Sequence, residues 1–174
     1  MGLEIVAGEQ ASASGLRDRL GVLAVLQADI TVSDTSEFSD CPGLALQLDA
    51  YARYLVEGHI AYTTLSDPGI QFCFSAPVDA TGHSSFFPLR QGSTFGVGPL
   101  EAFRQVVFSD AFPQGAGGQA TYLLGAAPQG SIKTYRAGGV LQLRFAQITP
   151  SPAGTRIRAG SWLAATKVKE YPIT

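Results

Sequence analysis

The sequence predicts an all-β fold, an antiparallel β-sandwich or jelly roll of about eight to ten strands that carries a short N-terminal helical arm. The composition predicts a globular chain rich in turns, because only 15% of the 174 residues are charged, 45% are hydrophobic, and Gly and Pro number 20 and 10. From residue 29 onward, hydrophobic residues recur with a period of two, the spacing of β-strands. Turn signals separate these runs every ~8–12 residues. No helical pattern stands between the runs, so a parallel α/β sheet is not expected.

The chain divides into an N-terminal arm over residues 1–28 and a β-sandwich domain over residues 29–174. Within the arm, Ser12 or Ser14 caps a helix that runs to Gln27. The apolar stripe of this helix has residues at i, i+4 and i+7, widened by three more: Leu16, Leu20 and Leu23, then Val22, Val25 and Leu26. Two glycines weaken the helix by about 1 kcal/mol each, so it needs something to pack on. That support is either the protein's own β domain or a partner, and the sequence leaves both open.

The first part of the β domain indicates four strands. A short strand at residues 30–32 opens it, residues 35–38 extend or pair with that strand, and a turn follows at 40–43. Two longer strands then place apolar residues on one face: Leu44, Leu46 and Leu48, and next Tyr54, Val56, Gly58, Ile60 and Tyr62. A strong turn signal at 66–69 leads to a fourth alternating run: Ile70, Phe72, Phe74 and Ala76. These last two strands are expected to form a hairpin.

The second part of the domain is less regular at first and closes with clear strands. One strand is expected near residues 84–89, followed by a long loop. The other expected elements are a strand at 103–108, a loop at 112–118, a strand at 120–124, strands at 131–136 and 140–147 around a tight turn at 137–139, and closing strands at 157 and 161–168. The strand at 140–147 has one apolar face: Leu141, Leu143 and Phe145.

The cysteines and the N-terminus indicate a soluble protein made in a reducing cytosol. Cys73 lies in a strand-like run as a small buried hydrophobe, and Cys41 precedes a turn. Two cysteines are too few for a disulfide-stapled domain, so no bridge is expected. The N-terminus lacks the basic and apolar regions of a secretory signal. The longest apolar run, residues 22–26, is far too short to span a bilayer, so no membrane partner is expected.

No residue pattern predicts catalysis, a metal site or a cofactor. His59 and His83 stand apart without further ligands at zinc spacing, and the serine beside His83 lacks an orienting acid. Three acidic residues near one turn do not match a calcium loop: Asp34, Glu37 and Asp40. Four arginines form either an exposed basic strip or the ordinary solvent side of a sheet: Arg136, Arg144, Arg156 and Arg158. The net charge of −2 predicts no nucleic-acid partner, and the protein is not expected to be an enzyme.

Three stretches of the chain carry a resemblance to a known class of proteins. They are IVAGE at residues 5–9 with the short helix after it; YLVEGHIAY at 54–62 running through DPGIQFCFSAP at 67–77 to ATG at 80–82; and AGGVLQLRFAQ at 137–147 with RAGSWL at 158–163. In these strand-and-turn patterns the chain resembles small structural proteins encoded in the virion gene clusters of tailed phages, especially phages that infect actinobacteria.

The resemblance implies a virion structural protein that is assembled in the host cytoplasm and resides in the virion. The specific expectation is a capsid decoration (cement) protein, a jelly roll that binds the outer surface of a phage head as a homotrimer and stabilises the capsid. Its partners would be two further copies of itself and the major capsid protein or another virion protein. The arm would hold the particle through apolar residues: Leu3, Ile5, Val6, Leu16, Leu20 and Leu23.

The alternative expectation is a minor tail or fibre protein. Its β domain would bind a host-surface glycan through the loops at 84–95 and 113–119. A hydrolase carried on the virion ranks last, because no acid–base pair stands in a suitable context. The number of copies per particle separates the first two expectations, since decoration demands many copies and a fibre tip only a few.

Overall fold

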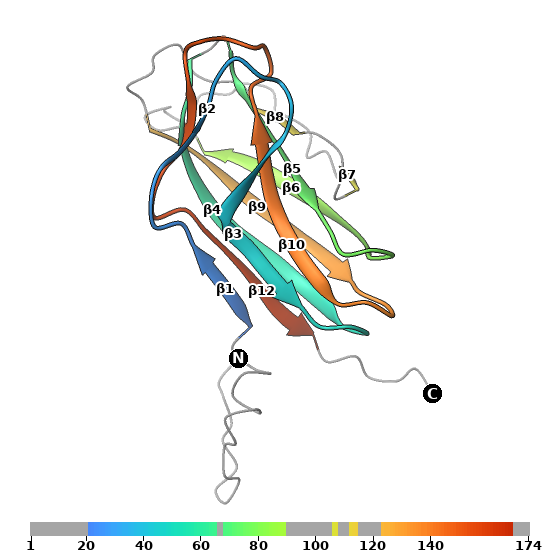
Figure 1. Cartoon of the computed structure of the whole chain (residues 1–174). Coiled ribbons are helices and arrows are strands. Elements are labelled where there is room, and N and C mark those ends of the chain that lie inside the picture. Colours follow the sequence, from blue (N-terminus) through green and yellow to red (C-terminus); the bar gives the residue numbers. More distant parts are fainter. Residues whose placement is uncertain (1–20, 66–67, 90–105, 108–111, 115–122, 169–174) are drawn as a thin grey trace, which may run out of the picture.

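The protein is a sandwich of two antiparallel sheets (Figure 1). The computed structural model describes residues 21–65, 68–89, 106–107, 112–114 and 123–168. In the larger sheet, eight strands are present, and its main path runs through β1 (Val22–Val25), β12 (Trp162–Val168), β4 (Arg53–Thr63), β9 (Leu124–Lys133), β6 (Thr81–Leu89) and β7 (Val106–Val107). Off this path, β4 also pairs with β11 (Thr155–Ile157), which pairs with β2 (Ile30–Val32).

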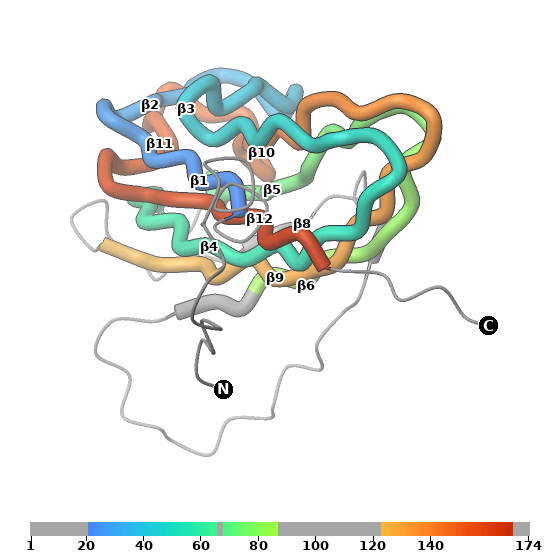
Figure 2. The backbone as a smooth tube through the Cα atoms, turned by 90° about the horizontal axis from the view of Figure 1, so that it is seen from below, coloured from blue at the N-terminus to red at the C-terminus, as the bar shows by residue number. Residues whose placement is uncertain are grey.

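The smaller sheet covers one face of the larger one, and Figure 2 shows the two layers from the end. It has four strands, in the order β3 (Ser39–Leu48), β10 (Gly139–Ala146), β5 (Ile70–Ser75) and β8 (Phe112–Gln114). No helix long and apolar enough to cross a bilayer occurs among the residues that the structure describes.

The strands from β3 to β10 are paired as a jelly roll. The first pairs with the last, β3 with β10, and the pairing continues inward as β4 with β9, β5 with β8 and β6 with β7. The chain is thus one long antiparallel hairpin that folds over, and contacts of β10 with β5 and of β9 with β6 complete the two sheets. The expected all-β jelly roll is confirmed. The described residues hold twelve strands, more than expected, and two of them, β1 and β8, form where a helix and a loop were expected.

Alternating apolar residues fill the space between the sheets. The inward faces expected from the sequence are confirmed: on β4, Tyr54, Val56, Ile60 and Tyr62 are at most 3% exposed, and on β3 and β10 the residues Leu44, Leu46, Leu141, Leu143 and Phe145 are fully buried. Each such side chain stabilises the fold by about 1.5–3 kcal/mol. The two-residue period therefore selects both the strands and the face that each one buries.

An aromatic cluster joins the two sheets. Phe86 of β6 stacks on Phe72 and Phe74 of β5, with ring centroids 5.4 and 5.5 Å apart. Phe72 also meets Tyr62 of β4 edge-on at 5.6 Å. Aromatic pairs of this kind add about 0.5–1.5 kcal/mol each beyond their buried area, so the cluster holds β5 against the larger sheet.

The expected hairpin between the strands at 54–62 and 70–76 is wrong. β4 and β5 lie in different sheets, so the chain crosses from one sheet to the other between them. Gly69 has a φ of +65° in this crossing, and its carbonyl accepts hydrogen bonds from the hydroxyls of Thr64 and Thr155, both at 3.1 Å. Turn residues mark where a strand ends, but they do not encode whether the next strand pairs with it or crosses to the other sheet.

The expected helix does not extend to Gln27, because residues 22–25 form β1. This strand pairs with β12, from Val22 opposite Ala165 to Val25 opposite Trp162. The apolar residues at 22–26 satisfy helical spacing but also alternate with period two, and pairing with β12 decides for the strand. Part of the segment assigned to the arm thus belongs to the larger sheet, and the rest of the expected helix lies outside the described residues.

The expected turn at 40–43 lies inside β3. The register of β3 against β10 shifts there, and Gln142 Nε2 bridges the irregularity by donating to the carbonyls of Cys41 at 2.7 Å and Leu44 at 3.2 Å. Because β3 is an edge strand with a bulge, it tolerates the proline and glycine that suggested a turn.

Other boundaries differ in smaller ways. Residues 35–38 are not a strand, the expected strand at 103–108 is described only as β7, and residues 112–114 of the expected loop form β8. A single strand, β9, covers 124–133 where two separate strands were expected at 120–124 and 131–136. The sequence pattern does not predict β9 as one strand, because this strand contains Pro128, and proline normally argues against a central strand.

Candidate functional site

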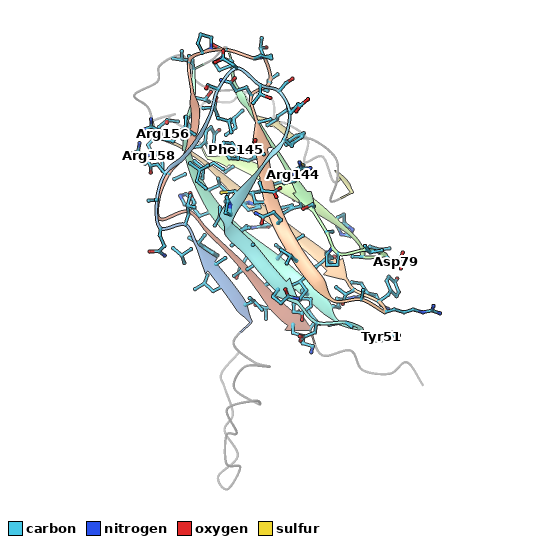
Figure 3. The ribbon with its side chains drawn as sticks, viewed as in Figure 1. Tyr51, Asp79, Arg144, Phe145, Arg156 and Arg158 are labelled. Carbon is cyan, nitrogen blue, oxygen red and sulfur yellow. The ribbon has the colours of Figure 1, made fainter. Side chains whose placement is uncertain are left out.

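Three turns lie together at one end of the sandwich, where β3 joins β4, β5 joins β6, and β9 joins β10. We call this end the tip and define it as residues 49–52, 76–80 and 134–138. Figure 3 labels Tyr51 and Asp79 on two of these turns. Each of the three turns carries the chain from one sheet to the other, so core strands hold it on both sides.

The tip exposes large apolar or aromatic side chains on every one of its turns. Tyr51 is 74% exposed, Val78 is 75% exposed and Tyr135 is 38% exposed. Lys133 Nζ lies 5.5 Å from the centre of the Tyr135 ring, which is a cation–π distance. Exposed aromatic groups on neighbouring turns are typical of a surface that binds a partner, because a tyrosine offers a large apolar face and a polar hydroxyl at low cost in entropy.

Hydrogen bonds of Thr134 join two turns of the tip, the one at residues 49–52 and the one at residues 134–138. Its side chain is fully buried; its hydroxyl accepts the N–H of Ala52 at 3.0 Å and donates to the carbonyl of Asp49 at 2.6 Å. The backbone N–H groups of Thr134 and Tyr51 donate to the carbonyls of Ala52 and Tyr135, both at 2.8 Å. The two turns therefore present their tyrosines on a fixed backbone.

Asp49 ties the same turn to the last strand. Its carboxylate accepts hydrogen bonds from Lys167 Nζ and from the Tyr54 hydroxyl, both at 3.1 Å. The hydrogen bond from Lys167 holds the pKa of Asp49 below its usual range, and burial raises the pKa of the Tyr54 hydroxyl. Because Lys167 lies near the end of β12, that end of the strand is also at the tip.

The tip contains strained backbone. Tyr51 and Asp79 have φ angles of +53° and +63°, in the left-handed region. Aspartate tolerates this region, but a bulky residue such as tyrosine loses about 1–2 kcal/mol there. Gly138 permits the close packing of the turns, since a Cβ at this position would lie 2.5 Å from the carbonyl oxygen of Leu48. A strained and exposed tyrosine contributes little to folding, which favours a binding role for it.

The sequence alone did not reveal this site. Tyr51, Val78 and Tyr135 each lie in a break between two strands, and large apolar residues within turns, where polar ones prevail, were the available signal. That signal is weak at any single turn. Only the sheet pairing shows that these three breaks meet at one end of the molecule.

The structure describes one of the predicted anchor residues. Leu23 lies on β1 and is 64% exposed on the outer face of the larger sheet, near Val25 at 39%. The others lie outside the described residues: Leu3, Ile5, Val6, Leu16 and Leu20. Gly21 packs against β12 beside Thr166. The residue after Thr166 is Lys167, which donates a hydrogen bond to Asp49 of the tip. Gly21, the first residue that the structure describes, therefore lies at the tip end.

Within the part of the chain that the structure describes, the two histidines form neither a metal site nor a catalytic pair. Across the described ranges, no group of three or more His, Cys, Asp or Glu side chains is placed to hold a metal ion. His59 lies opposite Trp162, and His83 lies opposite Ser131. Ser84 is 2% exposed, and its hydroxyl has no hydrogen-bond partner within the described part of the chain. Because neighbouring strand residues face opposite sides, Ser84 and His83 point apart.

Both cysteines are free and buried, as expected for Cys73. Burial raises the pKa of the Cys41 thiol to about 12 and that of Cys73 to about 11. A thiol with so high a pKa is a poor nucleophile at neutral pH, so these side chains serve the packing of β3 and β5.

The four arginines do not form one strip. Arg144 lies on the outer face of the smaller sheet, with its Nε 3.0 Å from Asp40 Oδ1 and its Nη2 donating to the carbonyl of Phe38 at 2.6 Å. Arg136 is exposed on a turn of the tip. Arg156 and Arg158 lie together at the other end of the larger sheet, away from Tyr51 and Asp79 in Figure 3.

No protein family model matches this chain, and no curated protein does. Among solved structures, a chain of the "Structure of infectious bursal disease virus Gx strain" is 8% identical with a TM-score of 0.21, over 86% of this chain and 40% of that chain. This chain thus spans less than half the length of the viral chain. A similarity of this size decides neither fold nor function.

Proposed function

We propose that this protein is a structural protein of a tailed-phage virion that decorates the outer surface of the phage head as a trimer. The jelly roll of β3 to β10 is an architecture that viral capsid domains share with lectins and other binding domains. The stretches that resemble phage structural proteins favour the virion among these uses. A structural role in assembly requires a surface that contacts the partner protein, and the tip is our candidate for that surface.

The tip is the observation that carries this proposal. Tyr51, Val78 and Tyr135 are exposed on a backbone that Thr134 and Asp49 hold in place, so docking would cost little additional ordering of the turns. Aromatic side chains of this kind are the ones that dominate binding energy at protein interfaces. Modest contacts per subunit, made together by the three linked subunits of a trimer, would give tight overall attachment.

The molecule also has a polarity that fits docking at the tip. Gly21, which follows all of the predicted anchor residues except Leu23, lies beside the end of β12 that is hydrogen-bonded to the tip. Arm and tip would then face the capsid together. The opposite end, with Arg156 and Arg158, would face away from it.

Co-sedimentation with empty capsids of the phage that encodes the chain tests the role of the tip. The test variant replaces Tyr51, Val78 and Tyr135 with serine. We expect its affinity to fall by at least about tenfold, because truncating an anchor residue commonly costs 1–2 kcal/mol or more. The matched control is Ile148→Ser, which removes a side chain that is 40% exposed on the link from β10 to β11.

The control is expected to bind as the wild type does. Equal binding by the triple variant, with cooperative unfolding retained by both, would refute docking through the tip. Equal loss in both variants would show that binding follows general surface hydrophobicity and would also refute it.

Truncation separates the arm from the sheet. A chain that starts at Gly21 keeps β1 and is expected to fold but to lose capsid binding. A chain that starts at Ala28 lacks β1 and also Leu26, which is 4% exposed and exchanges backbone hydrogen bonds with Ser161 and Gly160 at 2.8 and 2.9 Å. That shorter chain is expected to be markedly less stable. Full capsid binding by the chain that starts at Gly21 would rule out the arm as an anchor.

The trimer is tested by light scattering on the full chain. A mass near three times 18.3 kDa supports a closed trimeric knob, which symmetry limits to a discrete size. A monomer at all concentrations, with and without capsids, would refute the trimer. The alternative role, a minor tail or fibre protein, predicts a few copies per virion instead of many, and quantitative mass spectrometry of purified virions distinguishes the two.

A further inference from the structure

An open hollow lies on the outer face of the larger sheet, at the end opposite the tip. Its volume is about 610 Å³, within the range of sites that bind small molecules. Its lining comes from β4, β11 and the segments beside them: Ala61, Thr63, Leu123, Gly154, Arg156, Arg158 and Ala159. Thr63 is the last residue of an 11-residue strand that begins next to the tip, so the length of β4 separates the two surfaces.

Two guanidinium groups in this hollow share a single carboxylate. Arg158 Nη1 lies 3.0 Å from Asp29 Oδ2, and Arg156 Nη1 lies 3.8 Å from the same oxygen. Arg156 Nε also donates to Thr31 Oγ1 at 3.0 Å. The two arginine side chains are 46% and 41% exposed. The group thus has a net positive charge, and because each guanidinium has five N–H donors, several remain for a ligand.

Backbone hydrogen bonds hold the Asp29 carboxylate and the main chain of both arginines in place. Asp29 Oδ1 accepts the N–H of Ala159 at 2.8 Å, and the N–H of Arg158 donates to the carbonyl of Ala61 at 2.9 Å. Arg156 lies on β11, which pairs with β2 on one side and β4 on the other. A preorganised pair of arginines loses little entropy when it binds an anion.

The rest of the lining suits a sugar ring. Ala61, Gly154 and Ala159 of the lining are small, Leu123 is apolar, and Thr63 carries a hydroxyl. A pyranose has apolar C–H faces and hydroxyl edges, and the arginine forks match a carboxylate in bidentate geometry. We propose that this hollow binds a carboxylate-bearing saccharide, such as a uronic acid unit of a surface polysaccharide. This assignment is independent of the docking role proposed for the tip.

The test is an NMR titration of the ¹⁵N-labelled full chain with sodium glucuronate, with glucose as the neutral counterpart and inorganic phosphate as a second anion. We expect saturable shifts for glucuronate at the amides of Ala61, Thr63 and Ala159, and none for glucose. Phosphate is expected to bind more weakly, because it lacks a ring that could contact the small and apolar lining residues. Equal affinity for phosphate and glucuronate would overturn the saccharide assignment.

Four variants sharpen the test. Replacing both arginines, in R156Q/R158Q, is expected to weaken glucuronate binding at least about tenfold. D29N removes the competing negative charge while keeping an oxygen for Ala159, so it is expected to strengthen binding several-fold. A61L enlarges a side chain of the lining without changing any charge and is expected to abolish binding. R144Q, the matched control, removes an arginine paired with Asp40 on the other sheet and is expected to change nothing.

The proposal fails if glucuronate produces no saturable shifts or binds R156Q/R158Q and A61L as it binds the wild type. It also fails if R144Q loses as much affinity, since binding would then follow overall charge. The tip variant with serine at 51, 78 and 135 is expected to retain glucuronate binding. The two proposals can therefore fail separately.

Discussion

Tyr51 provides the sharpest test of how this molecule is built, through a comparison of Tyr51→Gly with Tyr51→Ala. The backbone of this residue has a φ of +53°, which costs any residue with a Cβ about 1–2 kcal/mol. Glycine removes that cost but adds about 0.4–1 kcal/mol of entropy to the unfolded chain. The side chain is 74% exposed, so both variants lose the same small amount of burial.

The difference between these terms predicts that the glycine variant is more stable than the alanine variant by about 0.5–1 kcal/mol. At an ordinary strand or helix position the order is reversed, and alanine is the more stable by a similar amount. The sign of the difference is therefore the result that matters. Urea unfolding at fixed m-value measures it as a shift in midpoint, and thermal unfolding shows it as a gain of about 1–4 °C for a domain of this size.

An alanine variant as stable as the glycine variant, or more so, would refute the strain at this turn. Tyr51→Asn is a useful third variant, because asparagine tolerates left-handed backbone while keeping a side chain, and it is expected to lie between the other two. All three variants lack the ring and are expected to bind capsids more weakly than the wild type. A glycine variant that gains stability and loses binding would show that the strained tyrosine is kept for function.

Three further predictions follow from the tip and the core. Thr134→Val is expected to lower the free energy of unfolding by about 2–3 kcal/mol, because it leaves the buried N–H of Ala52 and the carbonyl of Asp49 without their partner. Thr134→Ser keeps the hydroxyl and is expected to lose less. Equal losses of stability in thermal unfolding would contradict the role of the hydroxyl. The hydrogen bond from Lys167 lowers the pKa of Asp49, so wild type is expected to be more stable than Asp49→Asn above pH ~5 and to lose that advantage as the pH falls through the lowered pKa. A denaturation series between pH 7 and pH ~2 measures this difference. A stability advantage that grows in acid would contradict the expected direction of the pH dependence. Burial raises the pKa of Cys41 to about 12. Its reaction with a disulfide reagent at pH ~8 is therefore expected to be at least about a hundredfold slower in the folded protein than in urea. Fast labelling of Cys41 in the folded protein would contradict its burial.

The strands of the core follow from the sequence. Leu44, Leu46 and Leu48 alternate with less apolar residues, and the same period marks Leu141 and Leu143. Because a strand turns successive side chains to opposite faces, this period selects both the strand and the face that it buries. These inward faces are as predicted, and so is the sandwich that they form.

The errors concern residues whose local pattern fits two structures. The run at 22–26 suits a helix and a strand, and its pairing with β12 selects the strand. The proline and glycine at 42–43 suggest a turn, yet they lie in a bulged edge strand. Pro128 conceals a central strand. In each case the deciding contact is with a residue far away in the sequence.

The sequence by itself determined the class of this protein: an all-β chain with few charges, a buried thiol at Cys73 and strands whose inward faces are spaced by two. Only the tertiary structure decided which strands cross between sheets, and so which turns meet. Tyr51, Val78 and Tyr135 come from three separate breaks, and Arg156 and Arg158 share a carboxylate that lies more than a hundred residues away at Asp29. The physical reason is that periodicity is a local property of the chain, whereas a binding surface depends on long-range pairing, which one strand's pattern does not encode.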